Sequence, residues 1–132
     1  MMTISKSFLI HASRQLRQYG VSISGLCLLI VTILSLIPIS QEAPMNNIDK
    51  IEHLVAYAAC TMPISLTYYP RYKTIFWFAC IWGIMIEILQ PYVGRQADTI
   101  DAMVNALGAG LGVIIARYIF MVLCTNPLPS DE

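Results

Sequence analysis

The sequence has 132 residues, of which 57% are hydrophobic and 12% are charged, and its net charge is zero. Soluble domains carry about 25% charged residues, so charge is scarce in this chain and its positions are informative. The length fits one domain, and the balanced charge gives no sign of the basic surface of a nucleic-acid-binding protein.

Residues 1–20 contain Lys6, Arg14 and Arg17 together with apolar side chains. The apolar segment that follows is longer than the roughly 7–15 residue core of a cleavable signal peptide. We therefore interpret residues 1–20 as a short cytoplasmic, interfacial amphipathic helix.

Four apolar segments follow along the chain, at residues 21–39, 51–69, 74–93 and 100–124. Each is close to the roughly 20 residues that a helix needs to cross a bilayer. A soluble helix needs a polar face, which these segments lack over most of their length. The sequence predicts an all-α polytopic membrane protein, with a four-transmembrane-helix bundle over residues 21–124 and a cytoplasmic tail over 125–132.

Basic residues predict the orientation of this bundle, because they are concentrated on the cytoplasmic side of membrane proteins. Six of the eight lie on one predicted side: the three before the first apolar segment, Arg71 and Lys73 between the second and third, and Arg117 late in the fourth. Lys50 and Arg95 lie on the other side. Both termini are therefore expected in the cytoplasm.

The remaining polar residues form three groups near the predicted outer boundary. Within each group, spacings of three and four residues place most members on one helical face. A carboxylate as deep as Glu87 must face the bundle interior and find partners. We therefore predict a polar pocket between the second, third and fourth helices, open to the outside and supported by the first helix. The groups are Asp49, Lys50, His53 and Tyr57; Gly83, Glu87 and Gln90; and Arg95, Asp98, Asp101, Asn105, Gly108 and Gly112.

This ordered set of residues resembles the VanZ-like family of bacterial membrane proteins. The matching pattern spans about residues 45–115 and reads Asp49-Lys50-x-x-His53-x-x-x-Tyr57, then Gly83-x-x-x-Glu87-x-x-Gln90, then Arg95-x-x-Asp98-x-x-Asp101-x-x-x-Asn105-x-x-Gly108. The family is named for an accessory protein of glycopeptide resistance that lowers susceptibility to teicoplanin. The resemblance implies a multi-pass protein of the bacterial inner membrane. It indicates the family and the location of the protein more than a particular reaction.

An enzyme-like site for a lipid-linked or cell-envelope molecule is one hypothesis. His53 is the candidate general base or nucleophile, with Asp49 or Asp101 orienting its ring. Glu87, the deepest acid, completes the catalytic candidates His53, Glu87 and Asp101. Lys50 and Arg95 are suited to holding a phosphate or a carboxylate. The predicted ligand-binding residues are Asp49, Lys50, Tyr57, Gln90, Arg95, Asp98 and Asn105.

Two alternatives use the same residues without chemistry. A binding module would capture a zwitterionic or amide-rich ligand, such as a head group, an envelope glycan or an antibiotic. A structural interpretation makes the charges an ion-pair network that joins three helix ends. Transport is disfavoured, because polar residues at one end leave no path to the cytoplasm.

A metal site is the weaker interpretation, because Lys50 and Arg95 lie among the carboxylates and no metal-binding motif is present. We predict neither a metal nor a cofactor. The expected partners are the lipid bilayer and a lipid-linked or glycopeptide ligand. The pair Gly108 and Gly112 allows another helix to approach closely, either within the chain or in a homo-oligomer.

Overall fold

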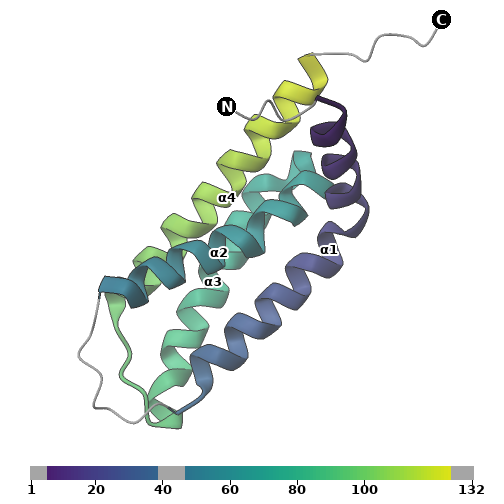
Figure 1. Ribbon diagram of the computed structural model, residues 1–132. Coiled ribbons are helices and arrows are strands. Elements are labelled where there is room, and N and C mark those ends of the chain that lie inside the picture. The colour runs from purple at the N-terminus through teal and green to yellow at the C-terminus, as the bar shows by residue number, and fades with distance from the viewer. Residues whose placement is uncertain (1–5, 39–46, 126–132) are drawn as a thin grey trace, which may run out of the picture.

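The computed structural model of the protein describes residues 6–38 and 47–125, and all of its long elements are helices (Figure 1). No strand occurs within these two ranges, which confirms the all-α class. Short 3-10 turns connect the later helices. The elements are α1 (Lys6–Leu36), α2 (Asn47–Thr67), η1 (Tyr69–Arg71), α3 (Tyr72–Leu89), η2 (Gln90–Val93) and α4 (Thr99–Thr125).

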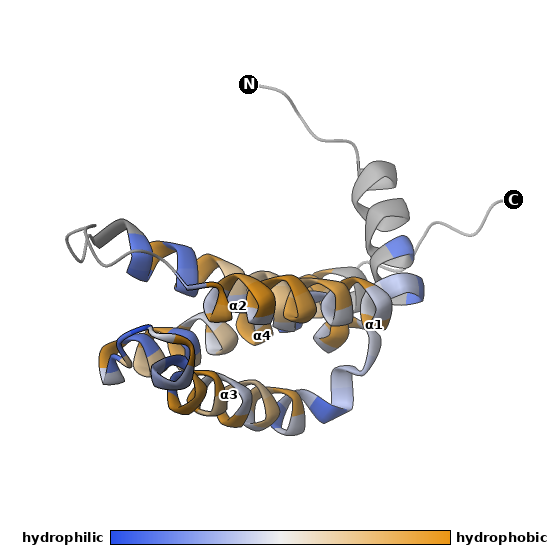
Figure 2. Cartoon of the chain, turned by 90° about the horizontal axis from the view of Figure 1, so that it is seen from below, coloured by the Kyte–Doolittle hydropathy of each residue, from blue (hydrophilic) through white to orange (hydrophobic). Residues whose placement is uncertain are grey.

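The four helices run alternately up and down, so their ends gather at two opposite ends of the bundle (Figure 1). The end of α1, the start of α2 and the link from α3 to α4 share one end, which we call the polar end. The turn η1 and the end of α4 lie at the other. Hydrophilic residues gather towards the two ends, with apolar residues between them (Figure 2).

Three stretches of the described helices are long and apolar enough to cross a membrane: Gln18–Leu36, Tyr69–Val93 and Thr99–Val122. Their outward faces support this, because large apolar side chains such as Ile33, Trp77 and Ile114 are exposed. The chain is therefore a membrane protein by composition and by surface.

Helix α2 is not among these three candidates, so the predicted count of four spans is not confirmed. Its first turns carry charged residues, and hydroxyl groups follow further along. Helix α2 can carry these polar side chains because it packs extensively against both α4 and α1. A helix that packs against protein on two sides needs fewer apolar side chains than one that faces lipid on most sides, and α2 still exposes Ile51 and Val55. Its buried residues include Tyr57, Cys60, Thr61, Ser65 and Leu66.

Helix α1 is continuous from Lys6 to Leu36. The predicted interfacial segment and the first predicted span therefore belong to one helix, with no break at residue 20. Residues 1–5 of that segment, and residues 126–132 of the predicted tail, lie outside the described ranges.

Close packing of α2 against α4 depends on two glycines. A Cβ atom at Gly108 would collide with the Leu54 carbonyl, and one at Gly112 would collide with the Thr61 hydroxyl and the Ala58 carbonyl. The Thr61 hydroxyl also donates to the Ala109 carbonyl at 3.1 Å. The face of α4 predicted to serve either internal packing or a homo-oligomer is thus covered by α2 of the same chain.

Candidate functional site

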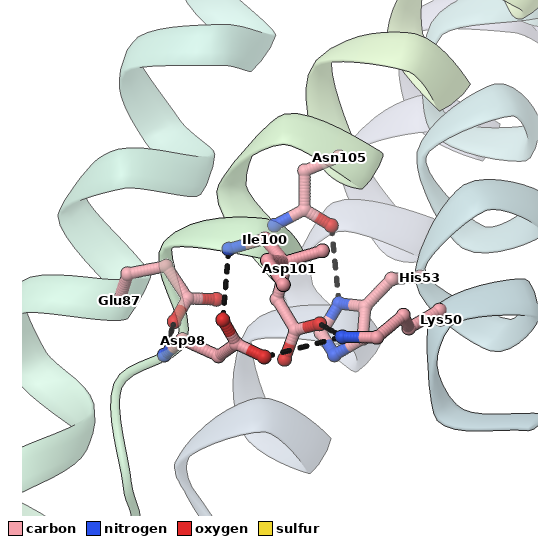
Figure 3. A network of polar contacts seen from close by, with 7 residues as sticks. All are labelled: Lys50, His53, Glu87, Asp98, Ile100, Asp101 and Asn105. Atoms are coloured by element: carbon pink, nitrogen blue, oxygen red, sulfur yellow. Dashed lines mark hydrogen bonds and ion pairs between the residues drawn. The ribbon is translucent and has the colours of Figure 1, made fainter. Parts of the chain in front are cut away.

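Six of the predicted site residues meet at the polar end, coming from α2, α3, α4 and the link before α4 (Figure 3). Their side chains point towards one another across the helix ends. Glu87 and Asp101 are buried and Asn105 is almost fully buried. The six are Lys50, His53, Glu87, Asp98, Asp101 and Asn105.

Asp98 connects the end of α3 to the start of α4. Its Oδ1 accepts from the Ile100 N–H at 2.8 Å, so it caps α4 at a position where a carboxylate is favoured. Its own N–H donates to Glu87 Oε2 at 3.1 Å. The Ile100 N–H, and then Lys50, hold the pKa of Asp98 below its usual range.

Lys50 joins α2 to the start of α4. Its Nζ lies 3.1 Å from Asp98 Oδ2 and 3.3 Å from Asp101 Oδ1. The hydrogen bond to Asp98 contributes most to raising the pKa of Lys50. Because Lys50 and Asp98 are partly exposed, their ion pair contributes only modestly to the stability of the fold.

His53 is oriented by Asn105. Its Nδ1 lies 3.0 Å from Asn105 Oδ1 (Figure 3). An amide oxygen only accepts, so neutral His53 carries its proton on Nδ1 and keeps a lone pair on Nε2. Asp49 or Asp101 was predicted from the sequence to orient this ring, whereas the hydrogen bond of Nδ1 is with Asn105.

Three buried polar atoms beside this pair have no hydrogen-bond partner within the described residues: Tyr57 Oη, Glu87 Oε1 and Asn105 Nδ2. Gly83 lies against two of them, since a Cβ there would be 3.2 Å from Tyr57 Oη and 3.3 Å from Asn105 Nδ2. Each unpaired buried group costs about 1–3 kcal/mol.

Gln90 and Arg95 attach the end of α1 to the link. Gln90 Nε2 donates to the Ser35 carbonyl at 3.4 Å, and Arg95 Nη1 donates to the Leu34 carbonyl at 3.1 Å. Carbonyls in the last turn of a helix lack partners within it. Both residues were predicted to bind ligand, and both instead contact the backbone of α1. Gln90 is buried and does not line the pocket at this end.

A pocket of about 280 Å³ opens at the polar end between α1, α2 and the link. Its position differs from the prediction, because α1 forms a wall and Glu87, Asp101 and Asn105 do not line it. The two glycines of α4 explain the difference: they bring α4 so close to α2 that the polar groups there bond one another directly. The lining residues are Val31, Leu34, Ser35, Asp49, Glu52, His53, Ala56 and Arg95.

A family model described as VanZ/LLP1 matches residues 3–122. The chain belongs to the VanZ/LLP1 family. This confirms the resemblance found on the polar residues, and it agrees with the three candidate spans in placing the protein in a membrane. No curated protein and no solved structure matches the chain.

Glu52 is the charged lining residue of the pocket in this VanZ/LLP1 protein that is not among the residues predicted from the sequence. It follows Asp49 by three positions, a spacing that places two side chains side by side on a helix surface. That spacing is a sufficient signal to group Glu52 with Asp49 on one face of the helix. With Glu52 included, the pocket has two carboxylates on α2 facing one guanidinium on the link.

A metal-ligand arrangement also occurs within the described part of this VanZ/LLP1 protein. One ligand atom each from Asp49, His53 and Asp101 lies within 4.8 Å of the others. Carboxylates with imidazole bind several divalent metals. However, the Lys50 ammonium, 3.3 Å from Asp101 Oδ1, already supplies positive charge there. We therefore assign no metal to these residues, and the absence of a metal stays a prediction.

Proposed function

We propose that this VanZ/LLP1 protein binds the polar part of a lipid-linked or cell-envelope molecule at the outer face of the bacterial inner membrane. The observation that carries the proposal is the composition of the pocket. Charged residues of α2 and of the link face one another beside apolar residues of α1, whose neighbours are exposed on the outside of the bundle. Such a lining suits a molecule with a charged head and an apolar tail.

The orientation rests on the basic residues at the opposite end. Arg71 and Lys73 are exposed where α2 turns into α3. The Arg117 guanidinium lies 4.6 Å from the centre of the Tyr72 ring, which places it at the same end. Basic residues favour the cytoplasmic side. The polar end, with its pocket, then faces outward.

We further propose that α2 crosses the membrane as a fourth span. It has 21 residues, which at 1.5 Å per residue reaches about 30 Å, the thickness of the hydrocarbon core. It also runs between the two ends of the bundle alongside the other helices (Figure 1). Both termini would then lie in the cytoplasm.

Catalysis at the same pocket is the second candidate. His53 lines the pocket, and its bond to Asn105 leaves Nε2 as the proton-accepting nitrogen. A general base needs this arrangement. His53 would accept a proton from a hydroxyl or amine of the bound molecule, while Arg95 holds an anionic group.

Mass spectrometry of overproducing bacteria separates these two functions. We would identify small molecules that co-purify with the protein, profile lipids and cell-wall precursors, and measure teicoplanin susceptibility. Variants Asp49→Asn and His53→Gln would be compared with Lys73→Gln, which removes a charge at the opposite end.

A binding protein retains a molecule that Asp49→Asn releases, without altering the envelope. An enzyme changes the abundance of an envelope molecule, and His53→Gln abolishes that change. If the network is purely structural, neither effect is expected, and protein levels should fall in the pocket variants. That last result would contradict the proposed function.

A further inference from the structure

We infer that the pocket recognises a phospholipid head group that carries both a primary ammonium and a phosphate. This inference rests on the proposed function and names the class of ligand. Charge, hydrogen-bonding capacity, size and access each support it.

Two acids of the pocket, both exposed, are available to a positive group. Asp49 and Glu52 have no hydrogen bond or ion pair within the residues that the structure describes, and both line the pocket. Lys50, their neighbour on α2, is already paired with Asp98 and Asp101. A cationic ligand group would therefore meet two carboxylates that are not neutralised by the described chain.

His53 adds a third acceptor. Its Nδ1 is directed to Asn105, so Nε2 is the nitrogen with a lone pair. A primary ammonium has three N–H donors, which matches one acceptor each from Asp49, Glu52 and His53. A quaternary ammonium has no N–H and cannot use them as hydrogen-bond acceptors.

Arg95 provides the opposite charge. One of its nitrogens donates to the Leu34 carbonyl, and its other N–H groups have no partner among the described residues. A guanidinium has five N–H donors in a planar fork that suits phosphate oxygens. Its bond to Leu34 also fixes the guanidinium at the pocket wall. Acids on one side and Arg95 on the other match a head group with both charges.

The size of the pocket limits the ligand. At about 280 Å³ it lies just below the roughly 300–1,000 Å³ of pockets that enclose drug-sized molecules. A head group fits this space, whereas a whole glycopeptide antibiotic does not. The apolar part of the ligand must then lie outside the pocket.

The surface of α1 offers a place for that apolar part. Val31 and Leu34 line the pocket, and Leu34 is 59% exposed. The neighbouring Ile30, Ile33 and Ile37 are also exposed on α1. Acyl chains can therefore remain in the bilayer beside α1 while the head group enters between α1 and α2.

Native mass spectrometry of the purified full chain tests this inference. The protein would be presented with equal amounts of phosphatidylethanolamine, phosphatidylcholine and phosphatidylglycerol of the same acyl composition. We expect phosphatidylethanolamine to be retained roughly tenfold over phosphatidylcholine, corresponding to one charge-assisted hydrogen bond. Asp49→Asn with Glu52→Gln should remove that preference, and Arg95→Gln should weaken all three lipids. Lys73→Gln is the matched control and should change nothing.

Two further measurements keep the outcomes distinct. Soluble phosphoethanolamine should displace the lipid if the head group is recognised, whereas inorganic phosphate at the same concentration should displace it less. The single variants Asp49→Asn and Glu52→Gln, with their thermal unfolding, cover the case in which the double variant does not fold.

Equal retention of the three lipids, or a preference that survives loss of both acids, would overturn the inference. If another envelope molecule still co-purifies and depends on Asp49, the proposed function stands and only the ligand class is wrong. If no molecule depends on the pocket, both are wrong.

Discussion

His53 Nδ1 and Asn105 Oδ1 lie 3.0 Å apart and connect the beginning of α2 to the beginning of α4. This single bond belongs both to the buried network and to the pocket, because His53 takes part in each. It fixes which ring nitrogen is available to a ligand, and it does so from a residue that is only 1% exposed.

Asn105→Leu should release the His53 ring. Loss of the acceptor leaves Nδ1–H without its partner, so both tautomers become populated. Nitrogen-15 chemical shifts of the imidazole, measured on labelled protein in detergent, report the two forms. Removing a buried hydrogen bond should also cost about 1–3 kcal/mol in the free energy of unfolding.

Ser65→Ala is the control for that measurement, because Ser65 on α2 is as buried as Asn105 and its hydroxyl has no partner within the described residues. It should leave the tautomer unchanged. An Asn105→Leu protein whose His53 keeps the proton on Nδ1 would show that another group orients the ring.

Gly108→Ala should destabilise the protein, because the new methyl group would collide with the Leu54 carbonyl of α2. Overpacking of this kind costs typically 1–3 kcal/mol. Gly25→Ala is the matched change, since nothing lies within 4 Å of a Cβ there. In a helix it should be neutral or stabilising by about 0.5–1 kcal/mol. Thermal unfolding in detergent measures both, and equal effects would contradict the close α2–α4 approach.

The contribution of the Lys50–Asp98 pair should depend on pH in a defined direction. The lowered pKa of Asp98 means that its contribution is present above its unfolded pKa of about 3.9 and is lost as pH falls through the folded value. The raised pKa of Lys50 means that its contribution is complete below about 10.4 and is lost as pH rises through the folded value.

Lys50→Met should therefore lower the unfolding midpoint at pH 7 and make progressively less difference below about pH 4. Lys73→Met, at the opposite end, controls for loss of a surface charge. A difference between Lys50→Met and the unchanged protein that persists at low pH would mean that the pair does not stabilise the fold.

Gln90→Leu should loosen the end of α1, because it removes the donor to the Ser35 carbonyl. Amide hydrogen exchange should become faster in the last turn of α1 and stay unchanged in α4. Gln96→Leu is the control, as Gln96 is exposed in the same link. Equal exchange in the two variants would show that the contact does not hold α1.

The network was predictable from the sequence, and the pocket was not. Glu87 and Asn105 lie deep in apolar segments, and hydrocarbon tolerates such groups only when they have partners, so their contacts with Asp98 and with His53 at the helix ends followed from spacing and depth. Gln90 and Arg95 donate to backbone carbonyls of α1. Every residue has such a carbonyl, so the pattern of side chains in the sequence could not indicate these contacts. The place of the pocket depends on how closely each helix pair packs.

The family and the all-helical class were also predictable, and three of the four predicted spans are found among the described helices, while the fourth is not confirmed. The apolar segment 51–69 is long enough to cross a membrane. Helix α2 is nevertheless not among the candidate spans, because it begins with charged residues and carries hydroxyl groups further along. Apolar length does not show how much of a helix faces lipid and how much of it packs against other helices.

Thiol labelling in intact bacteria tests most directly the claim that the polar end and its pocket face outward. Glu52→Cys and Lys73→Cys would each be made in a chain whose four native cysteines are replaced, and treated with a membrane-impermeant maleimide. We expect Glu52→Cys to be labelled in intact cells and Lys73→Cys to be labelled only after permeabilisation. Labelling of Lys73→Cys in intact cells, with Glu52→Cys protected, would contradict it.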